Sequence, residues 1–179
     1  MTAPANHHEL RAHGGLGGVL TAAALLTMAC AAAFCAYWPF GLPPAQPIPF
    51  SHRVHAGIKQ IGCFFCHEGA RTGARAGVPP VSRCMLCHER VAVTHPQIRR
   101  VRQHYFQNQP IDWVKVTVLP EFVYFDHQMH VQYGLDCGWC HGDVKSMDRI
   151  ELKYELLMGF CVDCHRRSGA THDCLACHR

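Results

Sequence analysis

One short pattern in this chain of 179 residues can do chemistry: two cysteines three positions apart, followed at once by a histidine. It occurs five times, at residues 63–67, 84–88, 137–141, 161–165 and 174–178, and accounts for ten of the twelve cysteines. On one turn of chain, both thiols can bond the vinyl groups of a single porphyrin, and the next side chain then faces the iron. The pattern therefore predicts five covalently bound haem c groups.

The predicted attachment residues are the ten motif cysteines: Cys63, Cys66, Cys84, Cys87, Cys137, Cys140, Cys161, Cys164, Cys174 and Cys177. The predicted proximal iron ligands are the five motif histidines: His67, His88, His141, His165 and His178. Paired Cys-x-x-Cys units also bind zinc or form redox-active dithiols, but neither needs a histidine directly after the second cysteine. Zinc ribbons use such units in pairs, which an odd number cannot satisfy, so haem attachment is the better interpretation.

A second pattern, an aromatic residue followed by two histidines, precedes the first and the third motif. Its two copies are Phe50-x-His52-x-x-His55 and Phe125-x-His127-x-x-His130. Each copy is followed by two motifs, so the haem-binding part divides into two related halves, at about residues 50–100 and 122–179. Histidines three positions apart lie on one face of a helical turn and can reach two neighbouring irons. We therefore predict these four histidines as distal iron ligands.

Four such histidines leave one of the five irons without a distal ligand. Met158, three positions before Cys161 in an apolar stretch, is the first candidate, although packing alone explains a methionine there equally well. His172 is the runner-up, and His104 and His95 are further candidates. A methionine ligand would give that haem a higher potential than the bis-histidine haems.

An uncharged stretch at residues 16–40 is long enough to cross a hydrocarbon core of roughly 30 Å. Tyr37 and Trp38 near its end favour a membrane interface, and Arg11 before it weakly indicates an N-terminus on the inside. We therefore predict a short cytoplasmic segment at residues 1–15, a single-pass anchor in the inner (cell) membrane at 16–40, and a periplasmic pentahaem domain at 41–179.

Two other interpretations of this N-terminal stretch stay open. Residues 16–28 resemble the apolar region of a signal peptide, with the alanines at 31–33 as a cleavage site. Cys30 could carry a lipid, although residues 27–29 make a poor lipobox. Otherwise we expect Cys30 and Cys35 to be ordinary small apolar residues of the span.

Charge is unevenly distributed along the chain. Nine Lys or Arg side chains fall within residues 53–102 against two acidic ones, whereas acidic residues outnumber basic ones by ten to seven from residue 103 onward. The simpler interpretation is that the basic stretch neutralises haem propionates, and the alternative is a docking face for an acidic partner. Nucleic acid is not expected as a partner of an exported haem protein.

The composition beyond residue 40 limits the fold. This part is rich in Gly, Pro and His and its apolar runs are short, so a conventional core would be thin. We expect a mostly irregular fold with short helices and little sheet, packed around five haems, in which folding and haem attachment are one process. A helix is predicted at residues 97–106, and alternation at 114–118 and 150–156 suggests two paired strands.

The order of these features resembles the pentahaem cytochrome subunit of alternative complex III. The shared features are the anchor, Pro-Ile-Pro-Phe50-Ser-His52, the Cys63 motif, Pro79-Pro80-Val81 before Cys84, Pro110-Ile-x-Trp113-x-Lys115-Val116, Phe122-Val-Tyr-Phe125 and Met158-Gly-Phe160-Cys161. The resemblance covers nearly the whole chain, although this sequence has Phe160 where tryptophan is expected in relatives. It implies an anchored, c3-like multihaem cytochrome with mainly bis-histidine haems and one His/Met haem.

The resemblance also implies partners. The subunit would work in a quinol-oxidising membrane complex, beside an iron–sulfur and molybdopterin-like subunit and a quinol-binding integral membrane subunit. It would pass electrons to a monohaem cytochrome c or a terminal oxidase. Similar pentahaem subunits can also accompany other molybdopterin-type oxidoreductases, which is one alternative.

Two further functional classes are considered. A stand-alone, membrane-anchored multihaem quinol dehydrogenase of the nitrate and nitrite respiration type would need a quinone pocket beside a haem. A haem enzyme acting on nitrite or hydroxylamine would need an open iron position. Because spare ligands are abundant, we expect an electron-transfer subunit with no catalytic residues of its own.

Overall fold

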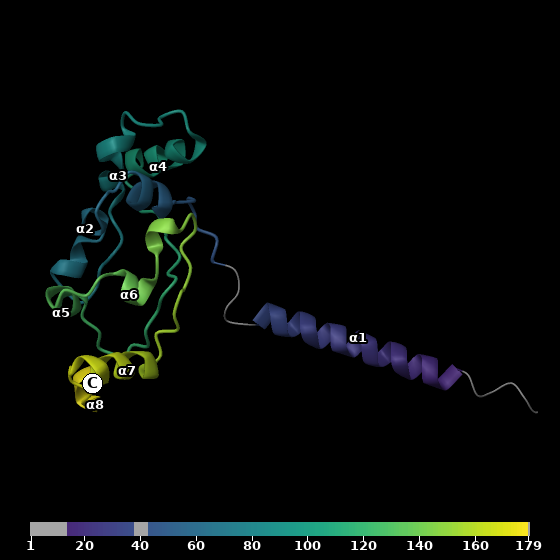
Figure 1. Ribbon diagram of the computed structural model, residues 1–179. Helices are drawn as coiled ribbons and strands as arrows, with labels where there is room; N and C mark the ends of the chain where they lie inside the picture. The colour runs from purple at the N-terminus through teal and green to yellow at the C-terminus, as the bar shows by residue number, and fades with distance from the viewer. Residues whose placement is uncertain (1–13, 38–42, 179) are drawn as a thin grey trace, which may run out of the picture. The chain divides into compact units, whose positions relative to one another are not determined.

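The computed structural model describes residues 14–37 and 43–178 (Figure 1). The chain divides into two compact units, residues 1–42 and 43–179, which are described separately below. Most of the predicted cytoplasmic segment, together with Arg11 and Trp38, lies outside the described residues.

The first unit contains one long helix, α1 (Gly14–Tyr37). It is rich in Ala and Leu, which favour helix, and it carries no acidic or basic side chain at either end. The hydroxyls of Thr21 and Thr27 donate to carbonyls one turn earlier, at 3.0 Å in each case. The stretch Gly17–Cys35 is long and apolar enough to cross a membrane, a property that it would share with a signal sequence. The prediction of one N-terminal apolar helix of this length is confirmed.

The second unit is built from short helical elements joined by irregular chain. In chain order they are η1 (Arg53–Ile58), α2 (Cys63–Cys66), η2 (Glu68–Arg71), α3 (Val81–His88), α4 (Pro96–Phe106), α5 (His127–Gln132), α6 (Gly138–His141), η3 (Val144–Ser146), α7 (Met158–Ser168) and α8 (Cys174–Cys177). Helices α3 and α4 lie at one end of the unit and α7 and α8 at the other (Figure 1). The predicted fold of short helices with little sheet is confirmed.

The hydrophobic core of this unit is small. One buried cluster joins α3 and α4 to the chain on either side of them: Ile48, Met85, Val101 and Ile111, with Val81, Cys84 and Trp113 packed against it. Within the described part of the chain, no large side chain is completely removed from solvent. Side-chain packing alone therefore gives this unit little of the burial that stabilises a domain of its length.

The predicted two-stranded sheet is wrong. Residues 114–118 and 150–156 are irregular, and the described residues contain no strand, only an isolated bridge between Val123 and His178. The backbone of Val114 instead exchanges two hydrogen bonds of 2.9 Å with the side-chain amide of Gln46. The Gln46 side chain thus pairs with the backbone N–H and C=O of Val114, which a neighbouring strand would otherwise have bound.

The predicted helix at residues 97–106 is confirmed as α4, which begins one residue earlier. Pro96 occupies its first turn, where a missing N–H costs nothing, and the backbone N–H of Gln97 donates to Nδ1 of His95 at 3.3 Å. Val101 on its inner face is buried against α3.

Candidate haem sites

Each Cys-x-x-Cys-His motif of the second unit forms one turn of helix. The backbone N–H of the motif histidine donates to the carbonyl of the first motif cysteine in α2, α6 and α8, at 2.9, 3.0 and 2.9 Å. Positions i, i+3 and i+4 of such a turn share one face. Both thiols and the imidazole of a motif are therefore directed toward the same side, as attachment of one porphyrin requires.

Four of the five motif histidines face a second histidine across a gap. The ring centroids are 6.4 Å apart for His52 and His67, 6.0 Å for His55 and His88, 6.4 Å for His127 and His141, and 6.0 Å for His130 and His165. The first histidine of each aromatic pattern thus faces the motif that follows directly, and the second faces the next motif. All four predicted distal histidines lie beside a motif histidine, and ligation itself stays a prediction.

This spacing fits an iron held between two imidazoles. A metal–imidazole bond is about 2.0–2.1 Å and the ring centroid lies about 1 Å behind the bonding nitrogen, so rings on opposite sides of one ion have centroids about 6 Å apart. Rings in direct van der Waals stacking would be closer, at roughly 3.5–4 Å. The four pairs therefore match the separation expected across a bis-histidine haem.

Hydrogen bonds fix which ring nitrogen faces each gap. In six of these eight histidines Nδ1 lies against a backbone carbonyl: His55 on Ser51 at 2.9 Å, His67 on Gly77 at 2.7 Å, His88 on Val91 at 3.1 Å, His127 on Ala74 at 2.7 Å, His130 on Asp126 at 2.7 Å, and His165 on Thr171. A carbonyl only accepts, so Nδ1 carries the proton and Nε2 keeps its lone pair for a metal. Histidines that ligate metals are held in this way.

The two remaining histidines are kept neutral by their surroundings. Burial, together with the neighbouring His67 and His55, lowers the pKa of His52 to about 4. Burial likewise lowers the pKa of His141, with His127 and His67 adding to the effect. Both imidazoles are therefore uncharged at pH 7, which is the form that binds a metal.

An aromatic ring packs against both histidines of each aromatic pattern. The Phe50 ring is 4.9 Å from His52, edge-on, and 4.3 Å from His55, stacked. The Phe125 ring is 4.7 Å from His127, edge-on, and 4.5 Å from His130, with the planes tilted by 34°. Each ring limits the rotation of two imidazoles, which explains why the repeated pattern begins with an aromatic residue.

The fifth motif differs from the other four. The His178 ring lies beside Phe122, with centroids 5.9 Å apart and planes 30° from parallel, and within the described residues no histidine ring faces it. Met158 begins α7 and is 69% exposed. His172 lies in the loop between α7 and α8. Neither Met158 nor His172 contacts the His178 ring in the described residues, so the sixth ligand here stays a prediction.

The two other candidates belong to the opposite end of the unit. His104 lies on α4, and its Nδ1 is 2.9 Å from the carbonyl of Pro110. His95 accepts a hydrogen bond at the start of the same helix. Because α4 and α8 lie at opposite ends of the second unit (Figure 1), neither histidine is positioned to serve His178.

The zinc interpretation finds no support in the described residues. No group of three or more His, Cys, Asp or Glu side chains in them could hold a metal ion. Zinc needs deprotonated thiols gathered around one point.

Electrostatic interactions between cysteines of different motifs indicate the spatial order of the sites. Besides burial, a neighbouring cysteine raises the thiol pKa in four cases: Cys84 beside Cys66, Cys137 beside Cys63, Cys140 beside Cys164, and Cys161 beside Cys177. The motifs therefore follow one another in space as 84–88, 63–67, 137–141, 161–165 and 174–178. Figure 1 agrees, since α3, α2, α6, α7 and α8 run from one end of the unit to the other. Chain order and spatial order differ at the first two sites.

Sequence reasoning missed the residues that hold the distal histidines. Ser51 and Asp126 occupy the same position of the two aromatic patterns, and the carbonyl of each accepts from the second histidine of its pattern. Both residue types favour helix starts, which is the signal that could have identified them. Asp148, which binds Ser51, has no local signal because 97 positions separate the two.

Comparison with known proteins gives two similarities. Residues 123–179 match the family described as cytochrome c7 and related cytochrome c, and this span contains the second histidine pair and the last three motifs. Over 161 residues the chain is 27% identical to a Nitratidesulfovibrio vulgaris protein named menaquinone reductase, multiheme cytochrome c subunit, covering 75% of this chain and 77% of that protein. In fold and cofactor the chain is therefore a multihaem c-type cytochrome related to the c7 group, and its role is electron transfer.

Proposed function

We propose that this chain is the electron-transfer subunit of a quinol-oxidising membrane complex of the alternative complex III type, carrying five haem c groups. The observation that carries the proposal is the set of four histidine pairs with centroids 6.0–6.4 Å apart, each containing a motif histidine. An iron held by two imidazoles has no open position for a substrate. Such sites suit electron transfer and give no support to a catalytic role.

When bound, haem c supplies one-electron transfer between ferric and ferrous iron. The chain's own residues hold and orient the group. The motif cysteines would form its thioether links, and the paired imidazoles would bind its iron. In six of the eight paired histidines a carbonyl at Nδ1 would leave Nε2 free to bind the iron, and Phe50 and Phe125 limit ring rotation.

The linear order of the sites supports a path with two ends. The site at residues 84–88 would be one terminus and the site at 174–178 the other, with 63–67 and 137–141 toward the middle. A donor and an acceptor would then dock at opposite ends of the unit. The terminal site at 174–178 is also the one that we propose to have Met158 as its sixth ligand.

The N-terminal helix supports membrane attachment. We propose residues 1–15 as a cytoplasmic segment, 16–40 as the anchor, and 41–179 as a pentahaem domain on the periplasmic side. The length and apolar character of Gly17–Cys35 are the observations behind this assignment. Quinone chemistry would take place in a neighbouring membrane subunit.

The name of the N. vulgaris relative favours a second candidate, in which the complex passes electrons to menaquinone rather than taking them from quinol. The part played by this subunit is the same in both cases. Only the direction of electron flow and the external partner differ.

Isolation of the native complex in mild detergent tests the proposal. We expect five haems per chain by mass spectrometry, and co-purification of an iron–sulfur and molybdopterin-like subunit with a quinol-binding membrane subunit. Haem reduction by a quinol analogue would support quinol oxidation, whereas oxidation of pre-reduced haems by a menaquinone analogue would support the second candidate. A chain that purifies alone and is reduced directly by quinol would instead be a stand-alone quinol dehydrogenase.

A further inference from the structure

The two halves of the haem domain brace one another. In the first half, η1 carries the chain after His52 and packs on η3 of the second half, with the backbone N–H of Arg53 donating to the carbonyl of Met147 at 2.9 Å. In the second half, α5 packs on η2 of the first half, with the backbone N–H of Gln128 donating to Gly73 at 3.1 Å. Each distal histidine pair is thus supported by the loop that follows the leading motif of the other half.

The side-chain support is not symmetric. In the second half, Asp126 caps its own helix by accepting from the backbone N–H of Gln128 at 2.8 Å. In the first half, the equivalent residue is Ser51, whose hydroxyl accepts from the backbone N–H of Val54 at 3.1 Å. A hydroxyl is a weaker hydrogen-bond acceptor than a carboxylate. In the first half, a carboxylate from the second half of the chain supplements the Ser51 hydroxyl.

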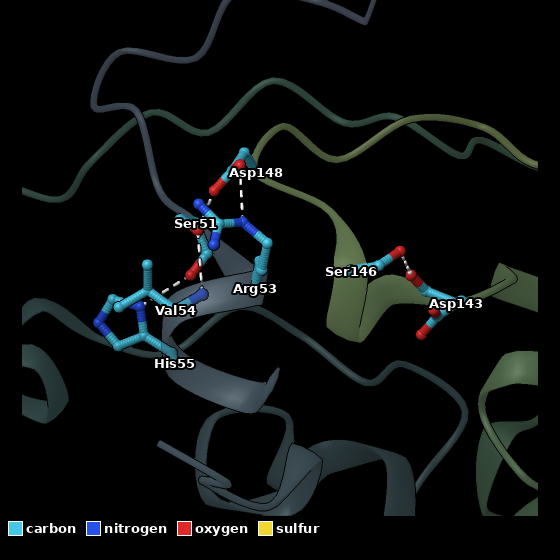
Figure 2. A network of polar contacts seen from close by, with 7 residues as sticks. All are labelled: Ser51, Arg53, Val54, His55, Asp143, Ser146 and Asp148. Carbon is cyan, nitrogen blue, oxygen red and sulfur yellow. Dashed lines mark hydrogen bonds and ion pairs between the residues drawn. The ribbon is translucent and has the colours of Figure 1, made fainter. Parts of the chain in front are cut away.

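That carboxylate belongs to Asp148, which reaches in from the second half (Figure 2). It accepts a hydrogen bond from the Ser51 hydroxyl at 2.6 Å and another from Nε of Arg53 at 2.8 Å. Asp148 therefore binds the residues on both sides of His52. The loop that presents it is closed by a hydrogen bond of 2.8 Å from the Ser146 hydroxyl to the carbonyl of Asp143.

The same serine orients a predicted iron ligand. The Ser51 carbonyl accepts from Nδ1 of His55 at 2.9 Å, and the His55 ring faces His88 at 6.0 Å. A continuous set of hydrogen bonds therefore leads from Asp148 through Ser51 to the imidazole at the 84–88 site. Outer partners of this kind orient ligating histidines.

We propose that Asp148 is a positioning residue for the sixth ligand of the 84–88 site, acting across the two halves through Ser51 on His55. The inference rests on the proposed haem function. Asp148 and Arg53 have side-chain exposures of 60% and 48%, and exposed ion pairs contribute little to folding stability. The effect therefore falls on how firmly His55 is held and not on whether the domain folds.

Displacement of the distal histidine by cyanide in the full-length, oxidised protein tests this directly. Haem content is measured first, because fewer than five haems per chain would contradict the proposed function and not this inference. With five haems present, we expect Asp148→Ala to increase the cyanide-binding rate of one haem by about tenfold, since outer partners of ligating histidines commonly change metal affinity or activity by about 10–100-fold. Ser51→Ala should affect the same haem, and the double variant should add little.

Two further variants separate positioning from a general loss of structure. Asp148→Glu keeps a carboxylate and should restore most of the slow binding, whereas Glu155→Ala removes an exposed carboxylate elsewhere and should change nothing. An Asp148→Ala protein with five haems and an unchanged cyanide rate at every site would overturn the proposal. So would an equal acceleration at all five sites, which a loosened fold would produce.

The packing of η1 on η3 offers an independent check. A Cβ added at Gly57 would lie 2.4 Å from the carbonyl oxygen of Lys145, so Gly57→Ala must push η1 away from the loop that carries Asp148. We expect the same haem to gain cyanide reactivity. Gly62→Ala is the matched control, because a Cβ there meets nothing within 4 Å. Equal behaviour of the two glycine variants would contradict the bracing of one half by the other.

Discussion

The thiols of Cys63 and Cys137 lie side by side, although 74 positions (137 − 63) separate them in the chain. Each begins the leading motif of its half, so the halves meet at these two motifs. The lowered pKa of His141 includes a contribution from His67, the histidine of the other leading motif. The two central sites are therefore electrostatic neighbours.

Replacing the predicted distal histidines should open one iron at a time. We expect His52→Ala, His55→Ala, His127→Ala and His130→Ala each to convert one haem from low spin to high spin, because each ring faces a different motif histidine. Electron paramagnetic resonance of the oxidised protein measures this. His95→Ala, which alters only the start of α4, serves as the control. Unchanged low-spin content in any of the four variants would refute that assignment.

Adjacent central sites should also influence one another's potential. His127→Met should raise the reduction potential of the 137–141 haem by roughly 0.1 V or more, because the choice of axial ligands changes haem reduction potentials over a range of about 0.8 V. Because Cys137 and Cys63 are neighbours, the 63–67 haem should shift more than the terminal haem at 84–88. Spectroelectrochemical titration measures both shifts, and a larger effect at 84–88 would contradict the spatial order of the sites.

The fifth site can be tested through its proposed sulfur ligand. If Met158 binds the iron at 174–178, the oxidised protein should show a near-infrared sulfur-to-iron charge-transfer band that Met158→Leu abolishes. His172→Ala should leave that band in place. A missing band in the parent protein, with loss of a low-spin signal on His172→Ala, would transfer the role to His172.

Acid should weaken the contact between the halves in a defined window. Hydrogen bonds from Arg53 and then Ser51 lower the pKa of Asp148. A lowered folded-state pKa contributes stability above the unfolded aspartate value of about 3.9, and this contribution is lost as the pH falls through the folded value. Because the pair is exposed, the melting temperatures of the parent and Asp148→Asn should differ by only a small amount, which is constant above about pH 5 and disappears as the pH falls below about 4. A difference that instead grows with acidity would exclude this cause.

Deletion of the N-terminal unit should separate attachment from haem binding. We expect residues 43–179, exported behind a cleavable signal, to acquire haem and remain in the soluble fraction, because the two units are compact on their own. The full chain should sediment with membranes because of Gly17–Cys35. If expression of the full-length sequence instead yields a soluble protein from which roughly the first thirty residues have been removed, the signal-peptide interpretation would be favoured.

Local patterns were predictable from the sequence, and long-range pairings were not. The motif turns and α4 follow from spacing, apolar periodicity and Pro96, all of which act within a few residues. Which motif each distal histidine faces depends on tertiary packing, so His55 could be assigned to His88 only from the structure. The strand prediction at 114–118 failed because the side chain of Gln46, 68 positions away, took the backbone groups of Val114.

The bond between Ser51 and Asp148 has a consequence for the time course of biogenesis. If the chain is exported from its N-terminus, Ser51 and His55 cross the membrane before Asp148, which follows Ser51 by 97 positions. During that interval the proposed haems of the first two motifs would be attached before Asp148 can bind Ser51. The first half therefore has all of its supporting contacts only after the loop of the second half that carries Asp148 has crossed the membrane. A chain that stops before Asp148 would carry haem in a first half that lacks the Ser51–Asp148 hydrogen bond.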